Sequence, residues 1–402
     1  MQSLKYLYRI GNGPSSSHTM GPANAIKFLK KMYPNAVSFD VTLYGSLAFT
    51  GRGHLTDYII KEKCKPLPCE VHFDYDFEPE FPNTFKVKIT LDNNEVAVKE
   101  VLSLGGGAIS IEGVSTSEDQ EVYPHKNLSE IKDFCKEKGL RFYEYVYLYE
   151  GEQIKEYLKK VWDAMKNSIK NGIEKEGYLP GKLKVQRKAK SFYDLTSSEE
   201  VGNPNKRYRL LAAYAYAVCE ENASGGKIVT APTCGACGVL PSILKFYQEY
   251  LNCSDEVIFN ALATASLFGN IAKTNGTISG AEGGCQAEVG NATAMAAAAI
   301  CELKNMSLDE IECAAEIAIE HSLGLTCDPI EGYVQIPCIE RNAVFAVKAL
   351  GAANLADVIC GTQHITFDEA VHTAFLTGRD MKAAYKETST GGLASSYKTY
   401  KK

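Results

Sequence analysis

The sequence has 402 residues, 45% of them hydrophobic and 23% charged, which is typical of a soluble globular protein, and its length predicts two domains. The net charge of -6 and the scattered lysines and arginines argue against a nucleic-acid surface. The N-terminus lacks the apolar core of a signal peptide, and we find no stretch long enough to span a membrane. We therefore expect a cytoplasmic protein with neither a nucleic-acid nor a membrane partner.

Residues 1–150 combine short strands with turns and predict an α+β domain. AVSFDVTLYGSLA (36–48) and NTFKVKITLDNN (83–94) alternate apolar and polar residues, as half-buried strands do. Between them, LTDYIIKEK (55–63) is typical of a helix. In LSLGGGAISIEG (102–113), a triple-glycine turn that permits positive φ joins two strands.

From residue 151 the pattern becomes helical. Residues 150–177 carry apolar side chains at helical spacing, and alanine-rich helices are expected at 208–223, 256–273, 292–304 and 308–323. We interpret residues 151–190 as a helical linker region and residues 191–402 as a mainly all-α catalytic domain.

The chain has 13 cysteines, and an odd number without an export signal makes a disulfide framework unexpected. Cys285, Cys327 and Cys338 differ from the others because they lie in the Gly- and Pro-rich segments SGAEGGCQAEVG and LTCDPIEGYVQIPC. Their spacing matches neither a ferredoxin run nor a zinc ribbon, so a metal site and purely structural loops are both possible readings. The pair Cys234 and Cys237 in TAPTCGACGVLP could be redox-active, half of a zinc site, or part of a ligand-binding turn.

Two histidines lie in Gly-rich loops with polar neighbours. His18 belongs to GPSSSHTMGP (13–22) and His54 to GRGHLTD (51–57). Both a catalytic role and a hydrogen bond within the histidine's own turn fit this setting. The first loop carries five small polar groups at the expected start of a helix, where an anion could bind.

Seven motifs, in order and across nearly the whole chain, carry a recognisable signature. They are GPSSSHTMGP, YGSLAFTGRGHLTD, LSLGGG, LPGKLKVQRKA, TAPTCGACGVLP, SGAEGGCQAEVG and CDPIEGYVQIPCIERNA. The chain resembles the bacterial iron-sulfur-dependent L-serine dehydratases, in the single-chain form with a β domain before an α domain. The resemblance implies L-serine as substrate, pyruvate and ammonia as products, and a homodimer.

The resemblance also implies a site. A [4Fe-4S] cluster is expected on Cys285, Cys327 and Cys338, with one iron left for substrate. His54 is the expected base that takes the α-proton, with Asp57 orienting its ring, and His18 is a second acid/base or carboxylate-binding group. The expected substrate contacts are Ser15, Ser16, Ser17 and Thr19 in the first domain, and Thr230, Thr233, Lys273, Asn275 and Ser279 in the second.

Many members of that family end in a cysteine that caps the fourth iron, whereas no cysteine follows Cys360 here. Cys234 and Cys237 are candidate replacements; if neither acts, the cluster should lose iron to oxygen faster, which adding a C-terminal cysteine would test. A cysteine desulfidase with a similar α domain is the nearest alternative activity, and a non-catalytic iron-sulfur sensor is the alternative from another class. A pyridoxal-phosphate dehydratase is disfavoured because it requires a large α/β fold.

Overall fold

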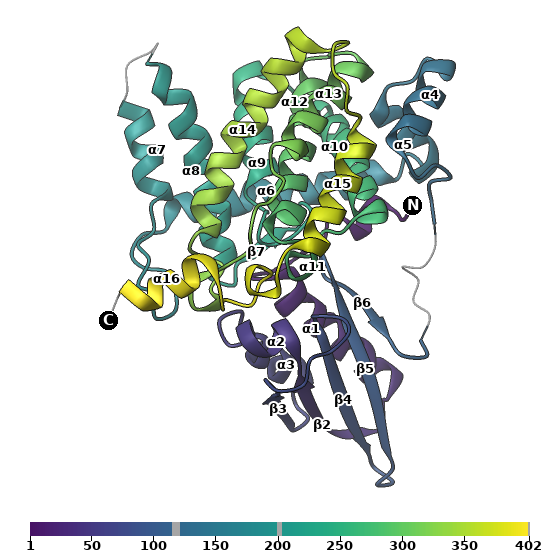
Figure 1. The fold of residues 1–402 in the computed structure, drawn as a ribbon, viewed down its shortest axis with the longest axis vertical. Helices are drawn as coiled ribbons and strands as arrows, with labels where there is room; N and C mark the ends of the chain where they lie inside the picture. Colours follow the sequence, from purple (N-terminus) through teal and green to yellow (C-terminus); the bar gives the residue numbers. More distant parts are fainter. Residues whose placement is uncertain (115–120, 199–202, 401–402) are drawn as a thin grey trace.

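A computed structural model describes residues 1–114, 121–198 and 203–400 of the chain. Figure 1 shows two parts: a small sheet with covering helices, built from the first third of the sequence, and a larger helical part above it. The expected class, an α+β region followed by a mainly helical region, is confirmed.

The first part is built on a five-stranded sheet with the order β3-β2-β4-β5-β6. Strands β2 and β3 are parallel and the other neighbours are antiparallel. The strands are β2 (Ala36–Leu43), β3 (Cys69–Phe73), β4 (Thr84–Leu91), β5 (Val96–Gly105) and β6 (Ala108–Ile111). Alternation of period two predicted β2 and β4, because one face of each is buried. On that face Phe39 pairs with Ile89 and Val41 with Val87.

Two helices cover this sheet. Helix α1 (Gly21–Met32) has a proline in its first turn, where a missing N–H costs nothing, and buries Ile26 and Leu29. Helix α3 (Thr56–Cys64) confirms the helix expected at 55–63 and buries Ile60 in the same core. A short helix, α2 (Gly45–Thr50), follows β2. The loops before α1 and α3 carry the two candidate histidines, so this packing brings the loops together.

The helical part contains the expected alanine-rich helices. Its helices are α4 (Leu128–Lys138), α5 (Phe142–Glu150), α6 (Ile154–Glu174), α7 (Ala189–Ser198), α8 (Pro204–Ala223), α9 (Val239–Leu251), α10 (Asp255–Asn275), α11 (Gly280–Gly283), α12 (Asn291–Leu303), α13 (Leu308–Glu320), α14 (Cys338–Ile359), α15 (Phe367–Asp380) and α16 (Gly392–Tyr400). Helix α12 is buried along its whole length and packs on α9, α10, α13 and α14. Six of its 13 residues are alanine, which permits this close approach.

Two short features join the parts. Strand β1 (Ile10–Asn12) pairs antiparallel with β7 (Lys227–Val229), and Leu4, Leu7 and Tyr8 are buried in the helical core.

Helices α4 and α5, which were expected to belong to the first domain, also pack on that core, and α6 buries Trp162 within it. The division at residues 150 and 190 stays a prediction.

The triple-glycine turn packs against the helical part. Gly105, Gly106 and Gly107 have φ of +89°, +58° and +84°, as expected for a turn that needs positive φ. A Cβ on Gly105 would lie 3.3 Å from the Cβ of Ser279, so glycine also lets the hairpin approach closely. The chain therefore places the loops of the first part directly against residues 278–279.

One helix of the described residues, α14, is long and apolar enough by length and composition to cross a membrane. It packs against α8, α12 and α13. A core helix passes the same test, so this finding assigns no membrane role.

Candidate active site

Both candidate histidines lie at the junction of the two parts and contact each other. His18 is on a π-helical turn, η2 (Ser16–Met20), that runs into α1, and His54 is in the turn between α2 and α3. Their ring centroids are 4.4 Å apart, and neither side chain is exposed to solvent. Folding therefore brings together two imidazoles from separate loops.

The hydrogen bonds around His18 assign its tautomer. The Ser46 hydroxyl donates to the backbone oxygen of Glu387 at 2.8 Å, so it can only accept from Nε2–H of His18, at 3.1 Å. Ser17 Oγ lies 2.9 Å from Nδ1 and donates to it. His18 thus carries its proton on Nε2 and a lone pair on Nδ1.

The same reasoning assigns His54. The Thr50 hydroxyl donates to the backbone oxygen of Ser46 at 2.9 Å and accepts from Nδ1–H of His54 at 3.1 Å. Nε2 then carries a lone pair, and it is buried with no hydrogen-bond partner among the described residues. The sequence analysis was wrong to choose Asp57 as the group that orients this ring. Thr50, four residues earlier, does so because the backbone N–H of His54 bonds to the Thr50 oxygen in a helical turn.

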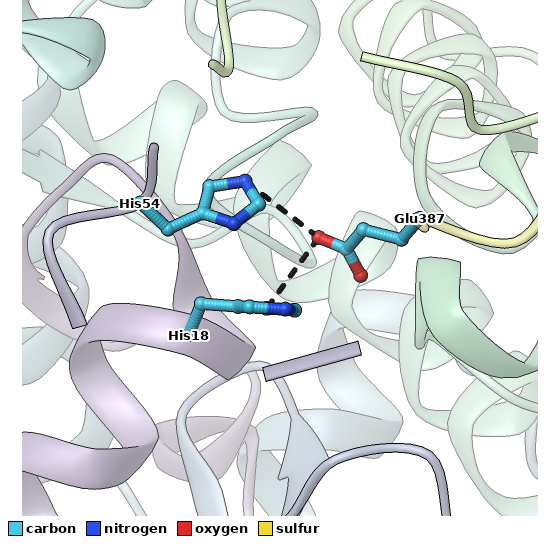
Figure 2. A group of neighbouring side chains, drawn as sticks. All are labelled: His18, His54 and Glu387. Atoms are coloured by element: carbon cyan, nitrogen blue, oxygen red, sulfur yellow. Dashed lines mark ion pairs between the residues drawn. The ribbon is translucent and has the colours of Figure 1, made fainter. Parts of the chain in front are cut away.

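Beside the two rings lies a carboxyl group that sequence reasoning missed. Glu387 Oε1 is 3.6 Å from Nδ1 of His18 and 4.0 Å from Nε2 of His54 (Figure 2). The Glu387 side chain is only 7% exposed, and its Oε2 has no hydrogen-bond partner in the described residues. The open lone pair of His54 Nε2 and the Ser17-bonded Nδ1 of His18 are therefore both close to one carboxyl group.

The backbone of Glu387 ties the two parts together. Its oxygen accepts from Ser46 of the first part, and its N–H donates to the Cys327 oxygen at 2.8 Å. Cys327 N–H in turn donates to the Tyr385 oxygen at 2.8 Å. Residues 385–387 therefore form a short bridge that joins the histidine loops to a cysteine loop.

Burial keeps this group of side chains uncharged. It lowers the pKa of His18 to about 4 and lowers the pKa of His54 well below its ordinary value, with a further contribution from neighbouring His18. Burial also raises the pKa of Glu387 well above its ordinary value, helped by the nearby Glu288. The lowered pKa values favour the neutral form of both rings, and the raised pKa of Glu387 favours its protonated form.

The three predicted cysteines come together beside this group. The Cys327 thiol donates to the Cys285 sulfur, and the charge of Cys285 raises the pKa of Cys338. The hydrogen bond from Cys327, together with the Arg341 guanidinium, lowers the pKa of Cys285 to about 6. One of the three is thus ready to be a thiolate.

Two further residues belong to this thiol group and were missed. Glu288 Oε1 accepts from Thr233 Oγ1 at 2.8 Å, and Cys327 Sγ lies 3.8 Å from Oε2. Burial raises the pKa of Glu288 to about 8, helped by the charge of Cys285. Glu288 and Arg341 each lie three residues after a predicted ligand, Cys285 and Cys338, so helical spacing was the available signal. We recognise no comparable sequence signal for Glu387.

The chemistry of the three thiols fits the ligand type of an iron-sulfur cluster. Among the described residues, His18, His54 and Glu387 are the one group of His, Cys, Asp or Glu whose ligand atoms all lie within 4.8 Å of one another. The three thiols do not meet that limit, and thiolates spaced around several metal atoms are what a cluster requires. A Cβ on Gly280 would lie 3.4 Å from Cys327 Sγ, so glycine leaves room beside that thiol.

The hydroxyls of the first loop support the histidines. Ser15 Oγ accepts from the His18 N–H at 3.0 Å, and Thr19 Oγ1 donates to the His54 backbone oxygen at 2.8 Å. Ser16 and Ser17 are buried with them. Their expected role as a carboxylate nest stays a prediction.

The other predicted contacts fall into two groups. Thr233 binds Glu288, and Ser279 is buried against the triple-glycine turn with a hydroxyl that has no hydrogen-bond partner among the described residues, so both lie near the junction. Thr230 instead bonds to the backbone of Leu7 and Arg9. Lys273 donates to Gln2, and Asn275 donates to the loop before α4. These last three polar groups hold the N-terminal segment and that loop, and their assignment to substrate stays a prediction.

The CxxC pair is buried in the helical part. The Cys237 thiol hydrogen-bonds to Cys219 of α8, whereas Cys234 lies near the charge of Glu288. Cys234 is thus the member of the pair that interacts with the thiol group. A capping role for either stays a prediction.

Comparison with known proteins identifies the family. Residues 82–394 match the family model described as serine dehydratase alpha chain, and residues 3–61 match the one described as serine dehydratase beta chain. The chain is 39% identical to L-serine dehydratase 2 of Escherichia coli (strain K12), over 98% of each chain. It is 38% identical to the L-serine dehydratase of Haemophilus influenzae (strain ATCC 51907 / DSM 11121 / KW20 / Rd), over 98% of this chain and 99% of that protein. The chain belongs to the serine dehydratase family.

Proposed function

We propose that this protein is an iron-sulfur-dependent L-serine dehydratase, which converts L-serine to pyruvate and ammonia. The observation that carries the proposal is the bridge at Glu387, bonded to Ser46 and to Cys327, which sets a neutral histidine base beside three thiols. The names of the relatives and both family models support the same reaction.

Serine dehydration requires a base for the α-proton and help for a poor leaving group. Cys285, Cys327 and Cys338 would hold a [4Fe-4S] cluster. When bound, the cluster supplies a Lewis-acid iron for the departing hydroxyl.

His54 takes the α-proton on Nε2. Thr50 holds its Nδ1–H, so the lone pair on Nε2 is fixed in direction, and the lowered pKa keeps the ring unprotonated at neutral pH. Loss of the α-proton and the hydroxyl leaves aminoacrylate. That product tautomerises to an imine, which water hydrolyses to pyruvate and ammonia.

The remaining groups bind and orient the substrate. Ser15, Ser16, Ser17 and Thr19 accommodate the carboxylate, with His18 as a second acid/base or carboxylate-binding group. The Glu387 carboxylate accepts a hydrogen bond from the α-ammonium group of serine. This cation would replace the proton that the buried Glu387 side chain otherwise holds. Thr233 and Ser279 line the facing wall.

A cavity of about 560 Å³ adjoins the site and offers a path for a small amino acid. It lies between residues 75–82 and residues 383–388, and Ser46, Lys386 and Thr388 line it. The same Ser46 binds His18, so the cavity and the site share a wall.

Pyruvate release from L-serine by anaerobically purified, iron-reconstituted protein tests the proposal. Turnover should disappear together with the visible cluster absorption when the sample is exposed to air. A fully loaded protein without turnover would contradict it. Sulfide release from L-cysteine with a higher kcat/KM than for serine would favour the desulfidase, and an intact cluster without either activity would favour the sensor. A cytoplasmic homodimer also remains part of the proposal, and analytical ultracentrifugation tests the dimer.

A further inference from the structure

The histidine pair and Glu387 have the composition of a mononuclear metal site. Two imidazoles and one carboxylate are a ligand set that zinc takes in proteins, with the fourth position open. The three ligand atoms come from η2, from the α2–α3 turn and from the segment before α16, and all are buried. Nothing in the serine dehydratase proposal uses them in this way.

The histidine tautomers favour a cation at this point. Ser46 takes the Nε2–H of His18 and Thr50 takes the Nδ1–H of His54, so Nδ1 of His18 and Nε2 of His54 are the unprotonated nitrogens, and both lie within 4.0 Å of Glu387 Oε1 (Figure 2). Metal binding needs neutral imidazoles whose other nitrogen is held by a hydrogen bond. Both conditions are met before any ion arrives, and the Ser17 hydroxyl that donates to Nδ1 of His18 would turn away to release the lone pair of that nitrogen.

Unpartnered buried atoms are a second and independent observation. His54 Nε2 and Glu387 Oε2 have no hydrogen-bond partner in the described part of the chain, although His54 is fully buried and Glu387 is only 7% exposed. Buried polar atoms without partners are costly, and a cation would satisfy both at once.

We propose that His18 Nδ1, His54 Nε2 and a Glu387 carboxylate oxygen form a binding site for a divalent transition-metal ion of the zinc class, and that this ion blocks the base. The ion occupies the lone pair of His54 that would take the α-proton. Binding does not depend on the proposed activity, whereas competition with L-serine rests on it.

The distances need only a small adjustment. Zn–N and Zn–O bonds of roughly 2.0–2.1 Å place tetrahedral ligand atoms about 3.3 Å apart. The separations of 3.6 and 4.0 Å from Glu387 Oε1 are close to that value. A rotation of the carboxyl group, whose Oε2 has no hydrogen-bond partner within the described ranges, could close them.

The test is a calorimetric titration of the anaerobic, cluster-loaded full chain with Zn²⁺, followed by zinc-edge X-ray absorption. We expect one equivalent of Zn²⁺ with nitrogen and oxygen neighbours at about 2.0–2.1 Å, and no sulfur at about 2.3 Å. We also expect added L-serine and Zn²⁺ to compete. A sulfur shell, which would mean binding to the cysteines, overturns the proposal.

Matched variants separate this site from surface binding. Glu387→Gln has nearly the same shape as the protonated carboxyl, so it should keep the fold, which thermal unfolding checks, and weaken Zn²⁺ binding at least about tenfold. His54→Gln should weaken it likewise and decides the matter if Glu387→Gln unfolds. His72→Gln is the control, because His72 lies on the surface 3.3 Å from Asp40 and 3.7 Å from Glu70, an exposed cluster of similar composition. Unchanged affinity in both site variants, or loss in His72→Gln, overturns the proposal. Binding without serine turnover would leave the metal site standing and contradict only the proposed function.

Discussion

The two parts of the molecule form two walls of the candidate site that differ in chemistry. We call His18 and His54 the first, or histidine, wall. The second, or helical, wall consists of Cys285, Cys327, Cys338, Glu288 and Arg341. The first part supplies His18 and His54, whose ring N–H groups are each held by a hydroxyl. The helical part supplies three thiols, the Arg341 guanidinium and the Glu288 carboxyl, buried where their charges act on one another. Hydrogen bonds fix the orientation of the two rings in the first wall. The second wall instead has thiol ligands that can hold a charged group. Under the proposed function, proton transfer falls to the first wall and cofactor binding to the second.

The largest effect should come from the helical wall. Cys285→Ser should lose both the visible cluster absorption and pyruvate formation to below detection, because serine is a poor ligand for iron-sulfur clusters. Cys253→Ser, at a partly buried cysteine between α9 and α10, is the matched control and should keep both. Normal turnover by Cys285→Ser would contradict the division of roles.

The histidine wall should show the opposite pattern. His54→Gln should keep the cluster absorption and lower kcat by about 10²- to 10⁴-fold, the usual range for losing a general base. His72→Gln, on the exposed surface, should leave kcat unchanged. If His54→Gln lost the cluster instead, the two walls would not be separable.

The fold followed from the sequence wherever a periodic pattern was long enough. Strands β2 and β4 and helices α6, α8, α10, α12 and α13 were all expected from spacing. The pairing of β1 with β7 was not expected, because each strand has only three residues, too few to show an alternation of period two. These short strands hold the first loop against the helical part.

The candidate site was predictable only in its local pieces. The loops of His18 and His54 stood out by composition, but nothing in the spacing could show that their rings lie 4.4 Å apart. Glu387 arrives from a segment more than 330 residues away from either histidine, so only tertiary packing reveals it. Asp57 was expected to orient His54 because it follows three residues later, whereas the turn that precedes His54 makes Thr50 the partner.

The burial of the histidine wall has a consequence for stability. His18 has a pKa of about 4 in the folded protein and an ordinary value near 6.5 when unfolded, so the unfolded chain binds more protons between these values. Stability is therefore complete above pH 6.5 and falls as the pH drops towards 4. The expected loss is about 1.4 kcal/mol per pH unit, or about 2 kcal/mol at pH 5.

Urea unfolding of the iron-free protein at pH 8 and pH 5 checks this expectation without interference from an acid-labile cluster. His18→Gln should lose about 2 kcal/mol less than the wild type between the two pH values, since glutamine does not titrate. Equal losses in both proteins would mean that His18 is solvated or charged in the folded state, and that the first wall is not a neutral one.

The smallest effect concerns the hydroxyl that holds the base. Thr50→Val keeps the side-chain shape but leaves Nδ1 of His54 without its acceptor, so the ring can place its proton on Nε2 and lose the lone pair that the reaction needs. We expect kcat to fall about tenfold, equivalent to about 1.4 kcal/mol, with KM nearly unchanged. Thr50→Ser should restore the rate and the pH profile. Thr56→Val is the matched control, because the buried Thr56 hydroxyl has no hydrogen-bond partner in the described residues and its removal breaks no contact with the ring. Equal losses in Thr50→Val and Thr56→Val would mean that packing of this turn, and not the tautomer of His54, sets the rate.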